Sequence, residues 1–289
     1  MPFNLEDVFY IYQKGMYFAQ EAIKGVNLEI NDGEMLGVMG VAGSGKSTLL
    51  QLLNALLKAE RGIVFYNENN LAKMKRKELV GLRREIGMVF QYPEQQIFAD
   101  KVYDEIAFGP RNMNLDPSKV EHRVREAMSQ VDLNFNEYSQ RPTTALSSGE
   151  KRRIAIASIL ALKPKHLLLD EPTAGLDLQG RQAIFACLRK INQQYNTTVV
   201  MVTHNFSHLL CMCQRLIIID HGTIALDTTI DKLLDNYDKI KNLGIDLPPH
   251  LEVTYHLLQR GWNLETSNLS VSAIAQQIAK QLKVDKRQL

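Results

Sequence analysis

The segment GVAGSGKS, Gly40 to Ser47, has the spacing G-x-x-x-x-G-K-[ST] of a phosphate-binding loop. Its glycines would let the backbone curl so that N–H groups point inward, at the positive end of the helix that follows. Lys46 would place a positive charge on the β- and γ-phosphates, and the Ser47 hydroxyl could ligate Mg²⁺. A chance glycine-rich turn is the alternative, and the strand-like and helical flanks argue against it. The predicted phosphate-binding residues are Gly40, Val41, Ala42, Gly43, Ser44, Gly45, Lys46, Ser47 and Thr48.

The segment HLLLDEP, which starts at His166, would supply the acidic groups that a phosphate-binding loop needs for hydrolysis. Its apolar strand delivers Asp170 to a strand end, where a carboxylate can hold Mg²⁺ through water. Glu171 follows directly and is placed to act as a general base. Taken alone, the segment could equally be a strand that ends in an ordinary acidic turn. The phosphate-binding loop in the same chain favours the catalytic interpretation.

Two single polar residues follow other apolar strands. Gln91 comes after GMVF, and His204 comes after VVMVT. In an open parallel sheet, ligands bind in the crevice at the carboxyl ends of the strands, where both residues would lie. We therefore predict that His204 contacts the γ-phosphate and that Gln91 contacts Mg²⁺ and the attacking water. Each residue alone is more typical of an ordinary loop.

The stretch TTALSSGEKRRIAIASIL, Thr143 to Leu160, joins small hydroxyl residues and a glycine to three basic residues and a run of small aliphatics. By itself it is typical of a polar loop that caps a buried helix. Nothing within the stretch requires more than that.

The elements that must position these residues follow from hydrophobic patterning. Alternation in FNLEDVFYIY and AIKGVNLEI predicts half-exposed antiparallel strands near the N-terminus. Short runs of Leu, Ile and Val separated by helical stretches predict an α/β fold with a parallel sheet buried on both faces. Helical signals without a strand predict a helical insertion between Pro93 and Leu162, and short amphipathic pieces predict a helical extension after about residue 235. The runs expected to form the sheet are 34–40, 85–90, 166–170, 197–203 and 215–220.

Composition narrows the class of protein. Of the 289 residues, 45% are hydrophobic, and 34 Lys and Arg against 32 Asp and Glu give a net charge of +2. This balance does not favour a nucleic-acid partner. The most apolar run, Ile154 to Leu162, is far shorter than the about 20 residues of a spanning helix. The N-terminus shows no export signal, and the three cysteines predict inert thiols in a reducing compartment. We therefore expect a cytoplasmic protein that meets a membrane only through a partner.

One basic run needs its own interpretation. KMKRKELVGLRREIG, from Lys73, concentrates lysines and arginines in a short helical stretch. A nucleic-acid patch would have aromatic residues interleaved for base stacking, and none is present. The favoured interpretation is a solvated surface face, which could lie near lipid headgroups.

Together, GVAGSGKS, Gln91, LSSGE, LLLDEP, AGLD and His204, in this order, resemble the motifs of an ABC transporter ATPase subunit over residues 1 to about 235. The resemblance implies a P-loop NTPase with a mostly parallel RecA-like core sheet, an N-terminal antiparallel β-subdomain and a helical subdomain at about 93–162. It implies an ATPase domain at 1–235, a small helical extension at 236–289, and ATP and Mg²⁺ as cofactors.

The resemblance also implies roles by position. Tyr12 falls where the family stacks an aromatic residue on adenine, although a plain strand aromatic is the alternative. Asp177, in AGLD, falls in the loop through which the two ATP sites communicate. In this family two ATPase subunits face head to tail, and the signature loop of one closes over the γ-phosphate held by the other. That loop here is Ser147, Ser148, Gly149 and Glu150, where the family usually has serine, two glycines and glutamine.

A narrower resemblance concerns VFQYPEQQIFADKVYDEIAFGPRN, Val89 to Asn112. It is similar to the ATPases of energy-coupling factor transporters and of related cobalt and nickel uptake systems, and to the second of their two ATPase types. EPTAGLDLQGR also resembles that group, except that Leu178 stands where proline is usual. DLPPHLEVTYHLLQRGWNL is similar to the group's C-terminal extension.

The partners implied are a second ATPase subunit, identical or paralogous, a transmembrane coupling protein, and a membrane-embedded subunit that binds a vitamin or metal ion. The chain itself would sit peripherally on the cytoplasmic face of the cell membrane. Glu94 and Asp100 beside Ile97 and Phe98 suggest a groove for an arginine-bearing helix of the membrane subunit. A solvated helix start is the alternative for this segment.

Other classes stay open. An ABC ATPase acting on DNA or ribosomes would share these motifs, but its DNA-repair relatives carry a long coiled coil and its translation-factor relatives carry two ATPase domains. A P-loop kinase or GTPase would lack both LSSGE and His204 at its strand end. The sequence does not give the transported substrate, because specificity for it would lie in another chain.

Overall fold

The computed structural model describes residues 2–285 and contains two β-sheets. The larger has six strands in the order β10-β9-β3-β8-β7-β6, parallel except for β10, which pairs antiparallel with β9. The α/β fold with a mostly parallel sheet is therefore confirmed. Its strands are β3 (Met35–Met39), β6 (Ile86–Val89), β7 (His166–Asp170), β8 (Thr198–Val202), β9 (Arg215–Asp220) and β10 (Thr223–Thr229).

The smaller sheet is antiparallel and has four strands in the order β2-β1-β4-β5. The two N-terminal strands were expected, whereas β4, β5 and β10 were not. A hydrogen bond from the backbone N–H of Lys24 to the carbonyl of Gly222, 2.8 Å, links this sheet to the end of the larger one. The strands are β1 (Phe3–Tyr12), β2 (Gln20–Ile30), β4 (Arg61–Tyr66) and β5 (Asn69–Asn70).

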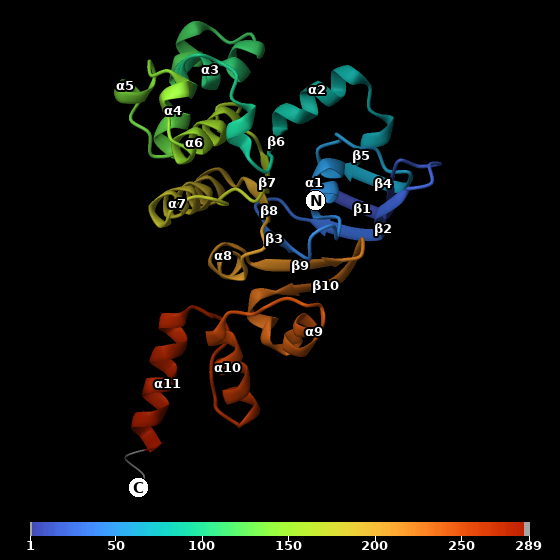
Figure 1. Cartoon of the computed structure of the whole chain (residues 1–289), viewed down its shortest axis with the longest axis vertical. Coiled ribbons are helices and arrows are strands. Elements are labelled where there is room, and N and C mark those ends of the chain that lie inside the picture. The colour runs from blue at the N-terminus through green and yellow to red at the C-terminus, as the bar shows by residue number, and fades with distance from the viewer. Residues whose placement is uncertain (1, 286–289) are drawn as a thin grey trace.

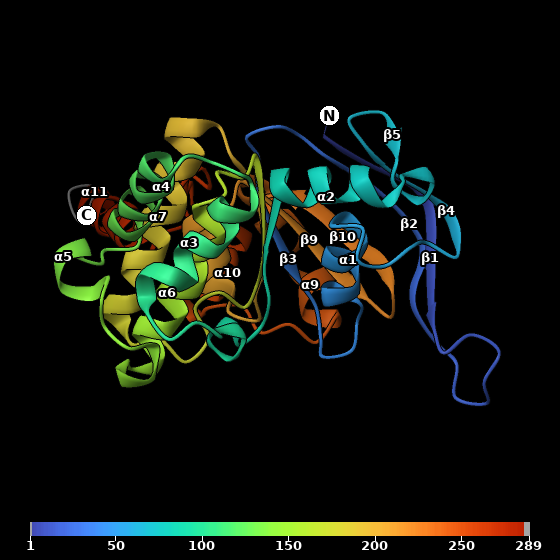
Figure 2. The same ribbon diagram turned by 90° about the horizontal axis from the view of Figure 1, so that it is seen from above.

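The helices form groups around the larger sheet (Figure 1). Helices α3 to α6 gather at one end, between β6 and β7 in the chain, as the sequence predicts for a helical insertion. Figure 2 shows the antiparallel sheet on the side of the molecule opposite this group. The helices are α1 (Lys46–Leu53), α2 (Arg76–Glu85), α3 (Val102–Asn112), α4 (Pro117–Gln130), α5 (Phe135–Tyr138), α6 (Ser148–Leu160), α7 (Leu178–Tyr195), α8 (Phe206–Met212), α9 (Tyr237–Asn242), α10 (Pro249–Gln259) and α11 (Val271–Asp285).

The larger sheet is buried on both faces. Along β8, Val199 and Met201 belong to the apolar cluster that includes the helical group, whereas Val200 and Val202 belong to the cluster under the antiparallel sheet and α1. Successive side chains of a strand point to opposite faces, so this alternation requires cover on each side. That requirement explains why the strands read as unbroken apolar runs.

The parallel register brings the strand ends that carry polar residues to one edge. Val38 pairs with Val202 across β3 and β8, Asp170 pairs with Val202 across β7 and β8, and Val89 pairs with Leu169 across β6 and β7. The residues that follow these strands therefore emerge side by side.

The C-terminal helices α9 to α11 lie below the sheet in Figure 1. Apolar side chains of this part, including Tyr237, Leu251 and Ile274, belong to the same cluster as α7 and α8. Helices after residue 235 were expected, and a domain boundary at that residue stays a prediction. Among residues 2–285, no helix is both long enough and apolar enough to cross a membrane. The basic run around α2 is exposed, as expected for a solvated face.

Candidate functional site

The loop from Gly40 to Ser47 joins β3 to the first turn of α1 and depends on its glycines. Gly40, Gly43 and Gly45 have φ angles of 150°, 76° and 112°, which side-chain-bearing residues rarely adopt. A Cβ at Gly45 would collide with the carbonyl oxygen of Ala22, and one at Gly40 would collide with that of Ile219. The chain therefore places a tightly curled backbone at the start of a helix.

The ammonium group of Lys46 lies within this loop. Its Nζ donates hydrogen bonds to the carbonyl oxygens of Gly40, at 2.8 Å, and Val41, at 2.7 Å. Burial lowers the pKa of Lys46, while the nearby carboxylates of Asp170 and Glu171 act in the opposite direction. The structure thus brings the loop lysine and the two predicted acids together.

A cavity of about 200 Å³ opens beside the loop. The hydroxyl of Tyr12 lies 3.2 Å from Oγ1 of Thr48, and the rings of Tyr10 and Tyr12 meet edge to face. Tyr12 is thereby fixed next to the phosphate-binding loop. The sequence analysis missed Gln20, which pairs with Tyr12 across β1 and β2 and lines the same cavity. The lining residues are Tyr12, Gln20, Ala22, Gly43, Gly45, Lys46, Ser47 and Thr48.

Asp170 ends β7 and is 6% exposed. Burial raises the pKa of its carboxyl group, and Ser47 and Lys46 oppose that rise. A hydroxyl and a carboxylate oxygen beside each other form the all-oxygen donor set that Mg²⁺ prefers. The residues present therefore fit the predicted metal. Gln91 is exposed and follows the adjacent strand β6, so it lies at the same edge of the sheet as Asp170.

Glu171 is held in one orientation by the end of β8. Its Oε2 accepts a hydrogen bond from the Thr203 hydroxyl at 3.1 Å, and its Oε1 accepts one from the backbone N–H of His204 at 2.7 Å. Nδ1 of His204 lies 2.8 Å from the same Oε1. Glu171 has a φ of 49°, an unusual value for a residue with a side chain and one that clusters at functional sites. Thr203 was missed, because a threonine at the end of a strand-forming run carries no signal of its own.

The segment from Ser147 to Glu150 lies at the start of α6 and lines a separate cavity of about 360 Å³. This cavity and the one beside Lys46 have no lining residue in common. Asp177 also lines it, and its side chain caps α7 by accepting from the N–H of Gly180 at 2.7 Å. The structure therefore does not bring the Ser147 loop to this chain's own phosphate-binding loop.

Comparison with known proteins identifies the family of this chain. The model of the ABC transporter family matches residues 23–174. The "Energy-coupling factor transporter ATP-binding protein EcfA2" of Clostridioides difficile is 37% identical over 97% of both chains, and that of Bacillus licheniformis is 41% identical over 86% of both. The chain belongs to the ABC transporter family. Its curated relatives are ATP-binding subunits of energy-coupling factor transporters, so both the broad and the narrow resemblance are confirmed.

Solved structures agree with this membership. One is cbiO1 from Clostridium perfringens, part of the ABC transporter complex cbiONQ, which is 32% identical with a TM-score of 0.73 and covers 89% of this chain and 98% of that one. Another is a dimeric ATP-binding cassette in a post-hydrolysis state bound to ADP and Pi. It is 29% identical with a TM-score of 0.71, and the match covers 78% of this chain and 98% of that one. This ABC protein is an ATPase subunit.

A groove of about 290 Å³ lies between α3, α6 and the segment after β6 of this ABC subunit. Phe98 and Phe108, 64% and 50% exposed, meet edge to face in its wall at 4.9 Å between ring centroids. One expectation is corrected here. Glu94 does not offer its carboxylate to the groove, because it pairs at 3.0 Å with Arg152, whose side chain is 2% exposed and needs a counter-charge.

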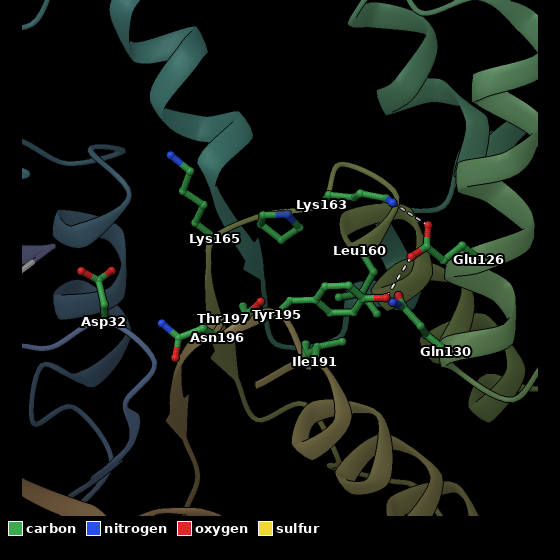
Figure 3. Close-up of a pocket in the computed structure, with 11 residues that line it drawn as sticks. Asp32, Glu126, Gln130, Leu160, Lys163, Lys165, Ile191, Tyr195, Asn196 and Thr197 are labelled. Atoms are coloured by element: carbon green, nitrogen blue, oxygen red, sulfur yellow. Dashed lines mark hydrogen bonds and ion pairs between the residues drawn. The ribbon is translucent and has the colours of Figure 1, made fainter. Parts of the chain in front are cut away.

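A further cavity, of about 350 Å³, lies at the other ends of the strands, between α4 and the end of α7 (Figure 3). Glu126 of α4 bridges it, accepting from the Tyr195 hydroxyl at 3.2 Å and pairing with Lys163 at 2.7 Å. Burial alone would raise the pKa of Glu126, but Lys163 and Tyr195 outweigh it and lower that pKa. The cavity is remote from the nucleotide residues, and we assign it no ligand.

Replacing Tyr195 with phenylalanine should lower the free energy of unfolding by about 1 kcal/mol at pH 7, because one hydrogen bond to a carboxylate is lost. The folded-state pKa of Glu126 lies below its ordinary value of 4.5, so its contacts stabilise fully above 4.5 and fade as the pH falls through the folded-state value. Urea unfolding at pH 7 should therefore show the full difference between variant and wild type, and this difference should shrink as the pH falls below 4.5 through the folded-state pKa. Tyr17→Phe, at a fully exposed tyrosine, is the matched control. An equal loss at both pH values would contradict the assigned bond.

Proposed function

We propose that this chain is one of two ATPase subunits of an energy-coupling factor importer for a vitamin or a metal ion, and that the chain lies peripherally on the cytoplasmic face of the cell membrane. The observation that carries the proposal is the separation of two half-sites. Lys46, Asp170 and Glu171 gather at one edge of the sheet, whereas the Ser147 loop lines a different cavity. A complete ATP site then needs a second subunit, and the similar cassette described above is dimeric.

Within one half-site, the curled loop and Lys46 bind the triphosphate, and the Tyr12 ring stacks on the adenine. Ser47 and Asp170 would hold Mg²⁺, and Gln91 at the neighbouring strand end would also contact it. When bound, the ion neutralises charge on the phosphate oxygens. Because Asp170 is buried beside Lys46, its carboxylate is positioned before the nucleotide arrives.

Glu171 acts as the general base. Thr203 and the His204 N–H each occupy one of its oxygens, which fixes the carboxylate at the strand edge. It takes a proton from water as the water oxygen bonds to the γ-phosphorus and the bond to the ADP oxygen breaks. His204, whose side chain is 78% exposed, contacts the γ-phosphate.

The second subunit completes each site in trans. Ser147 contributes a hydroxyl, and Ser148, Gly149 and Glu150 form the first turn of α6, whose N–H groups face the partner's phosphate. Asp177 lies in the same cavity and couples the two sites. ATP binding closes the pair, and hydrolysis with product release reopens it.

The transmembrane coupling protein docks in the groove beside Phe98 and Phe108. Two exposed aromatic rings in a groove suit the apolar face of an amphipathic helix. The membrane-embedded substrate subunit would then attach through that coupling protein, and no nucleic acid takes part.

Affinity purification of the tagged chain from membranes tests this function. Integral membrane proteins and a second ATPase should co-purify, and the assembly should hydrolyse ATP. Phe98→Asp should release the membrane proteins while ATP binding is retained, because a charge in the groove opposes burial of an apolar helix. Val80→Asp, at an exposed apolar residue of α2 outside the groove, is the matched control. Recovery of ribosomes or DNA without membrane proteins would overturn the proposal.

A further inference from the structure

Glu150 is the centre of a hydrogen-bonded cluster at the start of α6. Its Oε2 accepts from the Ser147 backbone N–H at 2.8 Å and from the Ser147 hydroxyl at 2.9 Å. Its Oε1 accepts from the Tyr138 hydroxyl at 2.9 Å and lies 3.5 Å from Arg141. The Arg141 guanidinium also lies over the Tyr138 ring, 4.7 Å from its centroid. Four groups from three residues therefore converge on one carboxylate.

The contact between Ser147 and Glu150 uses the only proton of the serine hydroxyl. The hydroxyl oxygen meanwhile accepts from the Glu150 N–H at 3.3 Å, which makes the pair a capping box. A hydroxyl can donate one hydrogen bond at a time. To donate to a phosphate, Ser147 must therefore turn away from Glu150, and a carboxylate holds that proton more strongly than a neutral amide would.

The negative charge of Glu150 also opposes approach of the partner's triphosphate. Glu150 stands in the first turn of a helix whose N–H groups face the partner's triphosphate, and two anions close together repel each other. Arg141 and Tyr138 are the groups placed to offset this charge. Burial would raise the pKa of Glu150, but the bonds from Ser147 and Tyr138 and the charge of Arg141 lower it, so the carboxylate stays ionised. The bond to Glu150 in turn raises the pKa of Tyr138.

We propose that Glu150 binds the Ser147 hydroxyl until the partner's nucleotide arrives. When this hydroxyl then turns to the nucleotide, Arg141 and Tyr138 offset the negative charge of the Glu150 carboxylate. Arg141 and Tyr138 are thus positioning residues for an ATP site in the other subunit. The inference rests on the proposed function and goes beyond it, because neither residue touches the nucleotide.

The test asks whether the effect of Arg141 depends on the charge at position 150. Arg141→Met is compared in two backgrounds, with Glu150 and with Glu150→Gln, in the full chain purified with its partner ATPase. Methionine keeps an unbranched apolar stem and removes the guanidinium that lies over the Tyr138 ring, and glutamine keeps a capping-box acceptor. The readouts are KM, kcat and the ATP concentration that gives half-maximal pairing in Glu171→Gln chains.

With Glu150 present, Arg141→Met should raise KM and the half-maximal ATP concentration by about tenfold, since an uncompensated anion then faces the phosphate. In the Glu150→Gln background the same change should have an effect of less than about twofold. Tyr138→Phe should follow the same pattern with a smaller effect, and Glu150→Gln alone should lower the half-maximal ATP concentration. Arg153 is the control cation: it lines the same cavity but donates to the carbonyl of Asp132, so Arg153→Met should act equally in both backgrounds.

Two results would overturn the inference. An equal loss from Arg141→Met in both backgrounds would show that Arg141 only supports the fold. No loss in either background would show that the charge of Glu150 needs no offset. Failure of the proposed function is distinguishable, because the Glu171→Gln chain would then not pair in ATP at all, whatever stands at positions 141 and 150.

Discussion

Glu171→Gln should abolish ATP turnover and leave ATP binding intact, so that the ATPase pair accumulates in its closed form. Glutamine keeps one acceptor oxygen for the His204 N–H, and its NH2 group can donate to the Thr203 hydroxyl, which would then turn to accept, so the loop geometry should survive. It cannot take a proton from water, and loss of a general base typically costs about 10² to 10⁴ in rate. Steady-state hydrolysis and size-exclusion chromatography in ATP measure the two halves of this prediction.

The control for this variant is Glu68→Gln, which neutralises an exposed acid in the turn between β4 and β5. It should turn over ATP at the normal rate and show no extra pairing. Normal turnover by Glu171→Gln would refute its assignment as the base. Loss of both turnover and ATP binding would instead indicate that Glu171 only maintains the site's structure.

Ser147→Ala should damage hydrolysis at the partner's nucleotide and spare the nucleotide bound by its own Lys46. The physical reason is the separation of the two cavities within one chain, which leaves the Ser147 hydroxyl able to reach only a phosphate brought by another subunit. Loss of one donor to developing phosphate charge should slow that site by about 10². The assay uses pairs in which one subunit carries the change, with product trapped and counted on each subunit separately.

Lys46→Met provides the matched comparison, because it should disable the site of the chain that carries it. In such pairs, Lys46→Met and Ser147→Ala on the same chain should therefore disable that chain's own site and slow the partner's site by about 10². Ser147→Ala losses confined to the chain's own nucleotide would show that the head-to-tail arrangement is wrong. The capping box also predicts some loss of helix stability in Ser147→Ala, so thermal unfolding of the variant should be measured beside its activity.

The local parts of the site were predictable from the sequence. The loop from Gly40 to Ser47 is a run of neighbouring residues, and its glycines set the backbone conformation wherever the run occurs. Asp170 ends an apolar strand and Glu171 follows it directly, so their place at a strand end needed no knowledge of the partners of that strand. The same holds for the strands of the parallel sheet, whose burial on both faces appears as unbroken apolar runs.

Other features depend on pairing between distant segments. Strands β4 and β10 are half-exposed and lie at or next to sheet edges, so their hydrophobic patterns are weaker than those of the buried strands. Glu94 appeared free to meet a partner, and only the packing of α6 revealed that buried Arg152 takes its charge.

By itself, then, the sequence determined the phosphate-binding loop, the strand-end acids and the family, because each is encoded by residues close together in the chain. The tertiary structure decided how those groups are held: the register of β7 against β8 places Thr203 on Glu171, and the fold of the helical group places Tyr138 and Arg141 on Glu150. These contacts join separate segments, and a hydroxyl or guanidinium carries no local mark of the carboxylate it will meet. Their geometry follows from packing, which only the folded chain specifies.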